Sequence, residues 1–289
     1  MVAFFTRNTT VINGSDTCGL FSQRPRTPNH GSRYFADDHQ RSLVFDSRRQ
    51  TWFPEDGRTF YDAAEKYLVD HFAGSALDAG YNKAAGIDSP AAIAAIVAGG
   101  LRGEVALVTG DVGDTVANDG SSLAKGLVWT PEDRMIVFGA RFKLAAVTAV
   151  AAYLGLTDVL PETTLEMPFT LATSTFTSNA TDAAGLLYDT AATTDTLRAV
   201  GVADDVDATH VDSAVVPVAA TYLDMLMTVS TLGVAKTWIN EVLKATLADA
   251  VNPATALSPV AVGTARTTTS QVLTLDYWFC HQDSRLALA

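Results

Sequence analysis

Cysteine is almost absent from this sequence. The chain of 289 residues has two, Cys18 and Cys280, and neither lies in a Cys-x-x-Cys or histidine-spaced metal motif. Disulfide-stapled scaffolds and zinc modules need more cysteines at closer spacing. We therefore expect two buried or idle thiols in a reducing compartment. Hydrophobic residues make up 48% of the chain, which allows a sizeable core without such links.

Long apolar runs are also missing. The most apolar stretches, residues 91–99 and 144–156, are rich in alanine and too short to span a bilayer. The first residues, Met-Val-Ala-Phe-Phe-Thr-Arg, place no positive charge before an apolar segment, so they do not resemble a signal peptide. We expect a protein that is made and folded in a cytoplasm and has no membrane partner.

Basic residues are scarce, and they are unevenly distributed. The net charge is −12, yet residues 1–57 hold seven arginines against six acids, whereas the remainder holds 13 basic and 26 acidic residues. An acidic body cannot release phosphate counterions, which argues against nucleic-acid binding. The arginine-rich head is where a protein or polyanionic partner would dock. On composition alone, a solvated neutral tail is the alternative.

Motifs for catalysis and metal binding are lacking. The five histidines show no His-x-x-x-His pair and no nearby nucleophile motif; they are His30, His39, His71, His210 and His281. The acidic stretch Asp204–Asp212 could offer oxygen ligands to Ca²⁺, but it lacks the EF-hand spacing and glycine, which favours an ordinary turn-forming loop. We predict no catalytic residue, no metal and no cofactor.

A period of two is the strongest pattern present. In residues 135–144 one parity is apolar and the other carries the charges; the apolar set is Ile136, Phe138, Ala140, Phe142 and Leu144. Such alternation is typical of a half-buried antiparallel strand. It recurs at residues 196–202, 223–230 and 271–280, and residues 101–109 also alternate. Many short strands separated by turn residues predict an all-β sandwich or barrel.

Three segments leave helix and strand in competition. Residues 62–72 have capping-box spacing at Asp62 and Glu65 but also read as a strand. The alanine content of residues 144–156 indicates a helix, yet their position directly after a strand favours a hairpin with it. Residues 238–250 can be drawn as an amphipathic helix. We expect a hairpin there, because the flanking strands would otherwise lose their partner.

The first 57 residues form a separate predicted region. Residues 1–30 are polar and have no period, so we expect an extended arm that is ordered on another surface. Residues 32–36 and 42–45 read as two short strands around the acidic turn at residues 37 and 38. A linker at residues 54–57 then ends the region. We therefore divide the chain into residues 1–57, an arm with a small β module, and residues 58–289, the sandwich.

Two parts of the sequence resemble known families. The succession Arg24-Pro25, Gly31, Tyr34, Ala36-Asp37, Leu43-Val44-Phe45 and Trp52 resembles a small β module common in bacteriophage tail and head-fibre proteins. A plain hairpin with a local aromatic core of Tyr34, Phe45 and Trp52 would give the same residues.

The second resemblance covers about residues 66–281. Phe72-Ala-Gly74, Leu77-Asp78, Tyr81, Gly185-Leu186-Leu187-Tyr188, Trp238-Ile239-Asn240 and the closing Val272–Phe279 are similar to the concanavalin A-like (laminin-G/glucanase-type) domain of phage virion proteins. It implies a jelly-roll β-sandwich. One departure is Asn240-Glu241, which stands where the family has Asn-Gly, the dipeptide favoured by a type I′ turn.

The glucanases of this fold carry their carboxylates on a strand reading Glu-x-Asp-x-x-Glu, and this chain has no such run. Glu162 and Glu166 lie in a proline-flanked loop with no implied geometry. Trp129, Trp238 and Trp278 could stack on a glycan, although sandwich aromatics usually pack in the core. The resemblance thus implies a protein that is not an enzyme.

The resemblances imply a phage virion structural protein, either a capsid decoration (cement) protein or a head fibre. It would lie on the capsid exterior, bind the major capsid protein and neighbouring copies, and form a homo-oligomer, with a trimer favoured. Arg24, Arg26, Arg33, Tyr34 and Trp52 would anchor it. The alternative is a tail-fibre or spike receptor-binding module that recognises host glycans.

Overall fold

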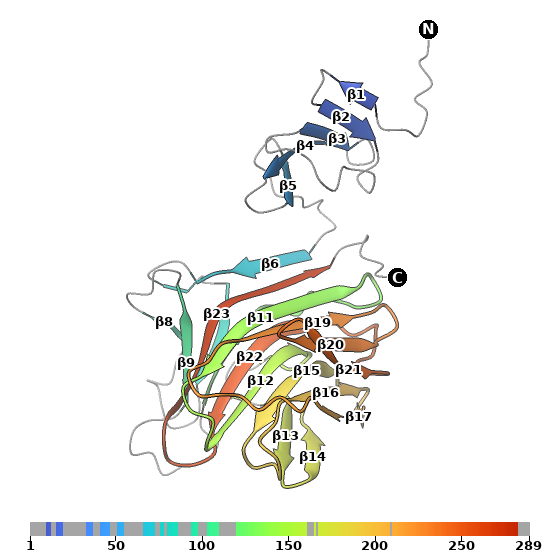
Figure 1. The fold of residues 1–289 in the computed structure, drawn as a ribbon. Helices are drawn as coiled ribbons and strands as arrows, with labels where there is room; N and C mark the ends of the chain where they lie inside the picture. The colour runs from blue at the N-terminus through green and yellow to red at the C-terminus, as the bar shows by residue number, and fades with distance from the viewer. Residues whose placement is uncertain are drawn as a thin grey trace. The chain divides into compact units, whose positions relative to one another are not determined.

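The computed structural model divides the chain into two compact units, residues 1–64 and 65–289 (Figure 1). It describes residues 10–12, 16–19, 33–36, 41–46, 51–54, 66–72, 76–77, 80–85, 94–97, 103–109, 120–160, 165, 167–208 and 210–282. Side chains are described within these ranges from Leu68 onward, except at residues 84 and 85. Every regular element in these ranges is a strand. None of the ranges contains a helix long and apolar enough to cross a membrane.

The first unit is a five-stranded sheet in the order β1-β2-β3-β4-β5. Its strands are β1 (Thr10–Ile12), β2 (Asp16–Gly19), β3 (Arg33–Ala36), β4 (Arg41–Asp46) and β5 (Thr51–Pro54). The two strands predicted at residues 32–36 and 42–45 are confirmed as the antiparallel pair β3 and β4. The expected arm needs correction, because two segments of residues 1–30 are strands of this sheet. They are too short for a period of two to be visible.

The second unit is a sandwich of two large sheets, named here after a central strand of each. The β12 sheet has the order β17-β16-β15-β12-β22-β10-β7, with β18 also paired to β16. Its strands are β7 (Asn82–Ala85), β10 (Gly120–Ala124), β12 (Val150–Thr157), β15 (Ala183–Asp189), β16 (Arg198–Ala203), β17 (Val206–Asp207), β18 (Val211–Asp212) and β22 (Ser258–Ala265).

The β11 sheet has the order β21-β20-β19-β11-β23-β9-β8. In addition, β6 pairs with the C-terminal part of β23, beyond the part that pairs with β9. Its strands are β6 (Lys66–Asp70), β8 (Ala95–Ile96), β9 (Val105–Thr109), β11 (Ile136–Leu144), β19 (Leu223–Val229), β20 (Ala235–Ile239), β21 (Val242–Leu247) and β23 (Gln271–Gln282). All pairings within both sheets are antiparallel. The predicted all-β sandwich is thereby confirmed.

The alternation of residues 135–144 is confirmed in β11. Its apolar parity is buried between the sheets, and Arg141 and Lys143 are only partly buried on the outer face. The other alternating segments correspond to β9, β16, β19 and β23. Residues 66–70, where a helix competed, form strand β6, which pairs with β23 from Lys66 opposite Gln282 to Asp70 opposite Trp278.

Residues 150–157 are a strand, as the hairpin prediction required, but their expected partner is wrong. β12 pairs with β15 and β22 in the opposite sheet and not with β11. The chain turns between the two sheets at residues 145–149, where Ala149 has a φ of 55°. The hairpin expected at residues 238–250 is confirmed as β20 and β21. Asn240 (φ 48°) and Glu241 (φ 67°) form its turn.

A cluster of aromatic side chains holds the sandwich core around Trp278, which is fully buried. Phe72 and Tyr81 pack against it, and Phe138 meets it edge-on at 6.3 Å between ring centroids. The indole Nε1 donates to the Tyr81 hydroxyl (3.0 Å), so burying the tryptophan leaves no unsatisfied donor. The Cys280 thiol is free and buried beside it, as predicted; the side chain of Cys18 lies outside the described residues.

The β12 sheet is buried on both of its faces. Its inner face packs against the β11 sheet, and its outer face packs under a hairpin of β13 (Phe169–Ala172) and β14 (Thr175–Ser178). This outer packing forms a second hydrophobic core between the sheet and the hairpin segment, residues 165–179. The sheet contributes Tyr153, Leu187, Val200, Val260 and Val262, and the hairpin segment contributes Met167, Phe169 and Leu171. The β11 sheet, in contrast, keeps an outer face with exposed and half-exposed side chains.

Candidate functional site

The predicted anchor residues fall in the first unit. Arg33 and Tyr34 lie in β3, where Tyr34 pairs with Leu43 of β4. Trp52 lies in β5 and pairs with Phe45, which also belongs to β4. The structure therefore brings Tyr34 and Trp52 to the two strands that flank β4. Arg24 and Arg26 lie outside the described residues. The aromatic cluster proposed for this sheet stays a prediction.

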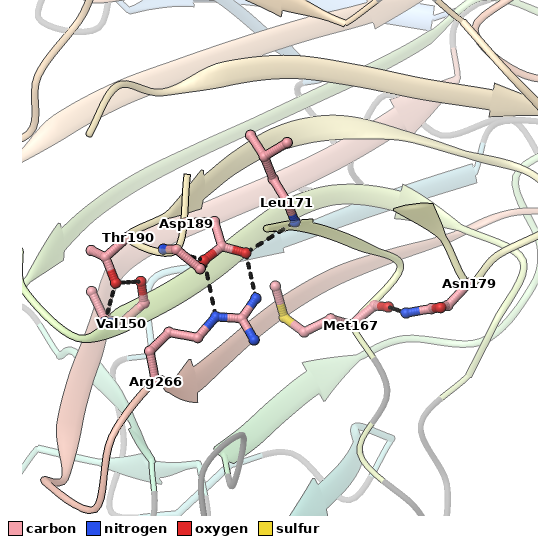
Figure 2. Close-up of polar contacts among 8 residues, drawn as sticks. Val150, Met167, Leu171, Asn179, Asp189, Thr190 and Arg266 are labelled. Carbon is pink, nitrogen blue, oxygen red and sulfur yellow. Dashed lines mark hydrogen bonds and ion pairs between the residues drawn. The ribbon is translucent and has the colours of Figure 1, made fainter. Parts of the chain in front are cut away.

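A pocket of about 420 Å³ opens where the β13–β14 hairpin covers the β12 sheet. Its lining residues come from the hairpin segment and from the ends of β15 and β22: Leu165, Met167, Thr170, Ala172, Asn179, Ala191, Thr264 and Arg266. Figure 2 shows the Arg266 side chain directed at Asp189, and Asn179 bonded to Met167 of the hairpin segment. The hairpin creates this pocket because it covers the sheet without filling the space next to Arg266.

One buried carboxylate connects three segments at this pocket. Asp189, the last residue of β15, accepts from Arg266 through Nε (2.9 Å) and Nη2, from Leu171 N (3.1 Å) and from Ala191 N (3.0 Å). The Asp189 side chain is 0% exposed and that of Arg266 is 17% exposed. A bidentate pair of this kind is geometrically specific. It fixes the hairpin onto the sheet through the Leu171 amide (Figure 2).

The pocket can hold a ligand but offers little for catalysis. Both oxygens of Asp189 are occupied by donors, so the carboxylate is poorly placed to accept a substrate proton. Asn179 also lines the pocket, and its side-chain amide donates to Met167 O (2.9 Å). The hydroxyl of Thr264 is buried and has no hydrogen-bond partner among the residues that the structure describes. This arrangement suits a small neutral polar molecule, held by a few hydrogen bonds and apolar contacts.

The acidic stretch Asp204–Asp212, considered above as a possible Ca²⁺ ligand set, begins with a tight turn. Asp204 (φ 50°) and Asp205 (φ 63°) join β16 to β17, and Asp204 Oδ1 accepts from the Asn252 side-chain amide (2.8 Å). Asp212 forms an ion pair with Arg198 (3.4 Å). Within the described ranges, no three His, Cys, Asp or Glu side chains are grouped to hold a metal ion.

The three sandwich tryptophans have different environments. Trp129 and Trp278 are buried, as expected for core aromatics, while Trp238 is half-exposed on the outer face of the β11 sheet. Glu162 and Glu166 lie outside the described residues. The outer face of the β12 sheet presents no carboxylate pair among its described residues, because apolar packing occupies it.

Sequence reasoning missed a polar cluster on the outer face of the β11 sheet. The Tyr222 hydroxyl donates to Glu104, and Lys143 Nζ lies 3.2 Å from Glu104 Oε2 and 4.4 Å from the Tyr222 ring centroid. The hydrogen bond from Tyr222 and the nearby Lys143 lower the pKa of Glu104 despite some burial. Glu104 and Tyr222 are 118 residues apart, and neither belongs to a recognisable motif.

Comparison with known proteins identifies the fold and no family. No protein-family model matches the sequence, and no curated protein sequence matches it. Solved structures match the sandwich. Bacillus licheniformis β-glucanase is 12% identical, with a TM-score of 0.50 over 75% of this chain and 98% of that chain. LamAcat from Zobellia galactanivorans is 11% identical, with a TM-score of 0.50 over 74% and 96%.

The carbohydrate recognition domain of Emp47p is 9% identical, with a TM-score of 0.50 over 75% of this chain and 94% of that chain. At such identities the likeness shows the fold alone. The sandwich therefore has the concanavalin A-like jelly-roll fold that the sequence resemblance implied. Both lectins and glycosidases share this fold, so the fold itself does not decide between binding and catalysis.

Proposed function

We propose that this chain is a structural protein of a tailed-phage virion, a capsid decoration or head-fibre protein whose sandwich is not an enzyme. The non-enzymatic part is supported by the apolar packing on both faces of the β12 sheet. On the open face of the β11 sheet, Glu104 is paired with Lys143 and Asp276 with Arg141. A glycanase of this fold needs paired carboxylates on one open sheet face. Here the hairpin covers the outer face, and Asp189 is occupied by Arg266 and two backbone amides.

The first unit is the proposed anchor. It is a separate compact unit with its own sheet, and it carries eight of the chain's 20 basic residues, all of them arginines. Arg24, Arg26 and Arg33, together with Tyr34 and Trp52, would dock on the major capsid protein or on a neighbouring copy in a homo-oligomer, with three-fold packing proposed. The acidic sandwich would then project from the capsid exterior and keep particles apart by like-charge repulsion.

Binding to naked phage heads tests this proposal. The full chain should co-sediment with heads, and the variant Arg24→Ala/Arg26→Ala/Arg33→Ala should lose most of that binding, since each arginine supplies a charged contact. The matched control is Arg48→Ala/Arg49→Ala, which removes similar charge from the same unit outside the proposed anchor. Equal binding by both variants would show that the anchor is assigned wrongly. No head binding by the full chain would refute the decoration proposal.

A glycan-binding module is the second candidate function. It is favoured by the half-exposed Trp238, because an aromatic ring on an open sheet face can stack on a sugar, and by a fold that includes carbohydrate recognition domains. A glycan array probed with the full chain and with Trp238→Ala distinguishes the candidates. Loss of a specific signal in the variant would favour a receptor-binding role on a tail fibre or spike. Copy number per virion gives a second criterion, since decoration needs many copies.

A further inference from the structure

A continuous apolar row crosses the outer face of the β11 sheet. The strand registers place one residue from each of six neighbouring strands in line: Val69 (β6), Phe279 (β23), Gly139 (β11), Leu226 (β19), Trp238 (β20) and Leu243 (β21). The strands that supply it lie side by side in Figure 1. Six strands spaced by about 4.8 Å give the row a length of about 24 Å. We call it the cross-strand row.

The cross-strand row is exposed and flat at its centre. Leu243 is 50% exposed, Val69 38% and Leu226 36%, and Phe279 and Trp238 are half-buried. A Cβ on Gly139 would overlap the ring of Phe279, so this ring lies directly over the glycine backbone. A larger residue at position 139 would displace the ring. Single exposed apolar residues are ordinary, whereas five apolar side chains aligned across a sheet form a patch of the kind found at interfaces.

Charge on this face is largely balanced, although the chain as a whole is strongly acidic. Arg141 lies 3.6 Å from Asp276, and Lys143 lies 3.2 Å from Glu104, which neutralises four groups beside the row. Like-charge repulsion between copies, which follows from the net charge of −12, is therefore reduced beside the row. A face that is neutral and apolar on an acidic protein is suited to contact another copy of the same protein.

Two further charges lie on opposite sides of the row. Lys236 precedes Trp238 by two residues in β20 and makes no ion pair with any described residue, and Asp224 precedes Leu226 by two residues in β19. Because β19 and β20 are antiparallel, these positions fall on opposite flanks. A two-fold axis along the row would exchange the flanks and place Lys236 of each copy across from Asp224 of the other. The two positions would be offset sideways by about one strand spacing, roughly 5 Å, across a gap of about 10 Å between the packed sheets, which the two side chains would span.

We propose that a second copy of this chain covers the cross-strand row, in a two-fold contact between the outer faces of two β11 sheets. Rows from the two copies pack on each other as in sheet-on-sheet packing, and the Lys236–Asp224 pairs set the orientation. The patch is small, so the contact is weak in dilute solution and becomes significant where copies are held close together. This two-fold contact would exist in addition to the proposed three-fold packing of copies. It rests on the virion proposal in one respect, because the capsid is what would hold the copies close together.

Sedimentation equilibrium of the isolated full chain tests the contact without capsids. The average mass should rise from that of one chain toward that of two as the protein concentration increases from a few micromolar to several hundred micromolar. Leu226→Asp should weaken this doubling at least tenfold, because it places a charge at the centre of the row. Leu232→Asp is the matched control, since Leu232 is 76% exposed and lies off the row, in the turn between β19 and β20. Equal behaviour of the two variants would overturn the proposal.

Charge exchange provides the sharper test. Lys236→Asp and Asp224→Lys should each weaken association several-fold, and the double variant should restore it, because only the proposed pairing places these residues opposite each other. A double variant as weak as the singles would overturn the two-fold arrangement, and so would a wild-type chain that never doubles in mass. The assay contains no heads, so its failure would leave the capsid-binding proposal standing.

Discussion

Asp189 shows how a single carboxylate can position a functional surface. Its four donors come from β13, from the turn after β15 and from the segment after β22, so it joins parts of the chain up to 77 residues apart. Sequence reasoning could not find this pair, because Asp189 and Arg266 belong to no motif. Their meeting depends on the sheet order, which brings β15 and β22 to the two sides of β12.

Asp189→Asn should destabilise the sandwich by about 3 kcal/mol, because it leaves Arg266 partly buried without its charge partner. Urea denaturation followed by tryptophan fluorescence measures the change. Asp195→Asn is the control, since Asp195 is exposed and outside the junction. A loss no larger than in this control would mean that Arg266 finds enough solvent to compensate.

The Tyr188 phenol makes the free energy of unfolding decrease as the pH rises into the alkaline range. Burial, followed by the nearby charge of Asp195, raises the pKa of Tyr188 to about 12, and its hydroxyl donates to Val147 O (2.7 Å). In the unfolded chain the group ionises near pH 10. Because the folded state favours the protonated form, this contribution is complete below pH 10 and is lost as pH rises toward 12.

The prediction is that the wild-type protein loses its advantage over Tyr188→Phe as pH rises. At pH 9 the wild type should be the more stable of the two because of the Val147 hydrogen bond, and at pH 11 the difference in urea midpoint should shrink. Chemical denaturation of both proteins at the two pH values checks this. A constant difference would show that Tyr188 ionises in the folded protein as it does in the unfolded chain.

A strand with one open face shows its period of two in the sequence, whereas a strand with two covered faces can lose that signal. β11 alternates because Arg141 and Lys143 lie on its outer face. β12, with eight consecutive buried residues, has no alternation, so its alanines suggested a helix. The hairpin with β11 was a reasonable expectation from sequence proximity, but a jelly roll passes from one sheet to the other at that point. The short strands β1 and β2 gave no periodic signal at all.

The β20–β21 turn carries a residue poorly suited to its backbone. Glu241 is exposed and has a φ of 67°, which costs a side-chain-bearing residue more than glycine. Glu241→Gly should therefore raise the free energy of unfolding by roughly 0.5–1 kcal/mol. The reciprocal change, Gly233→Ala, should destabilise the protein, because Gly233 has a φ of 74° and an added Cβ would overlap Val251 O. Denaturation midpoints that move in the same direction for both variants would contradict this account.

At the scale of the whole molecule, the chain consists of two units whose sheets are separate. All pairings of β1–β5 lie within the first unit, and all other described pairings lie within the second. The Pro-Glu-Asp-Gly linker at residues 54–57 predicts a boundary between residues 57 and 58, and the structure divides the chain between residues 64 and 65. The composition thus indicated two regions, while their exact limit depends on where β6 joins the sandwich.

Calorimetry should resolve the two units. Heating the full chain should give two unfolding transitions, since each unit has its own hydrogen-bonded sheet. Deletion of residues 1–64 should remove one transition and leave the other within a few degrees of its original midpoint. A single transition in the full chain that shifts strongly on deletion would show that the units unfold cooperatively.

The position of β23 has a consequence for how the protein is made. This strand pairs with β11, β9 and β6, so it joins three parts of the β11 sheet, and it reaches back over more than 200 residues to Lys66. A ribosome that has not yet released residue 282 holds a chain whose β11 sheet is still in three pieces and whose core lacks Trp278. The sandwich must therefore close after synthesis of β23, slowly for its size, and newly made chains expose unpaired strand edges until then.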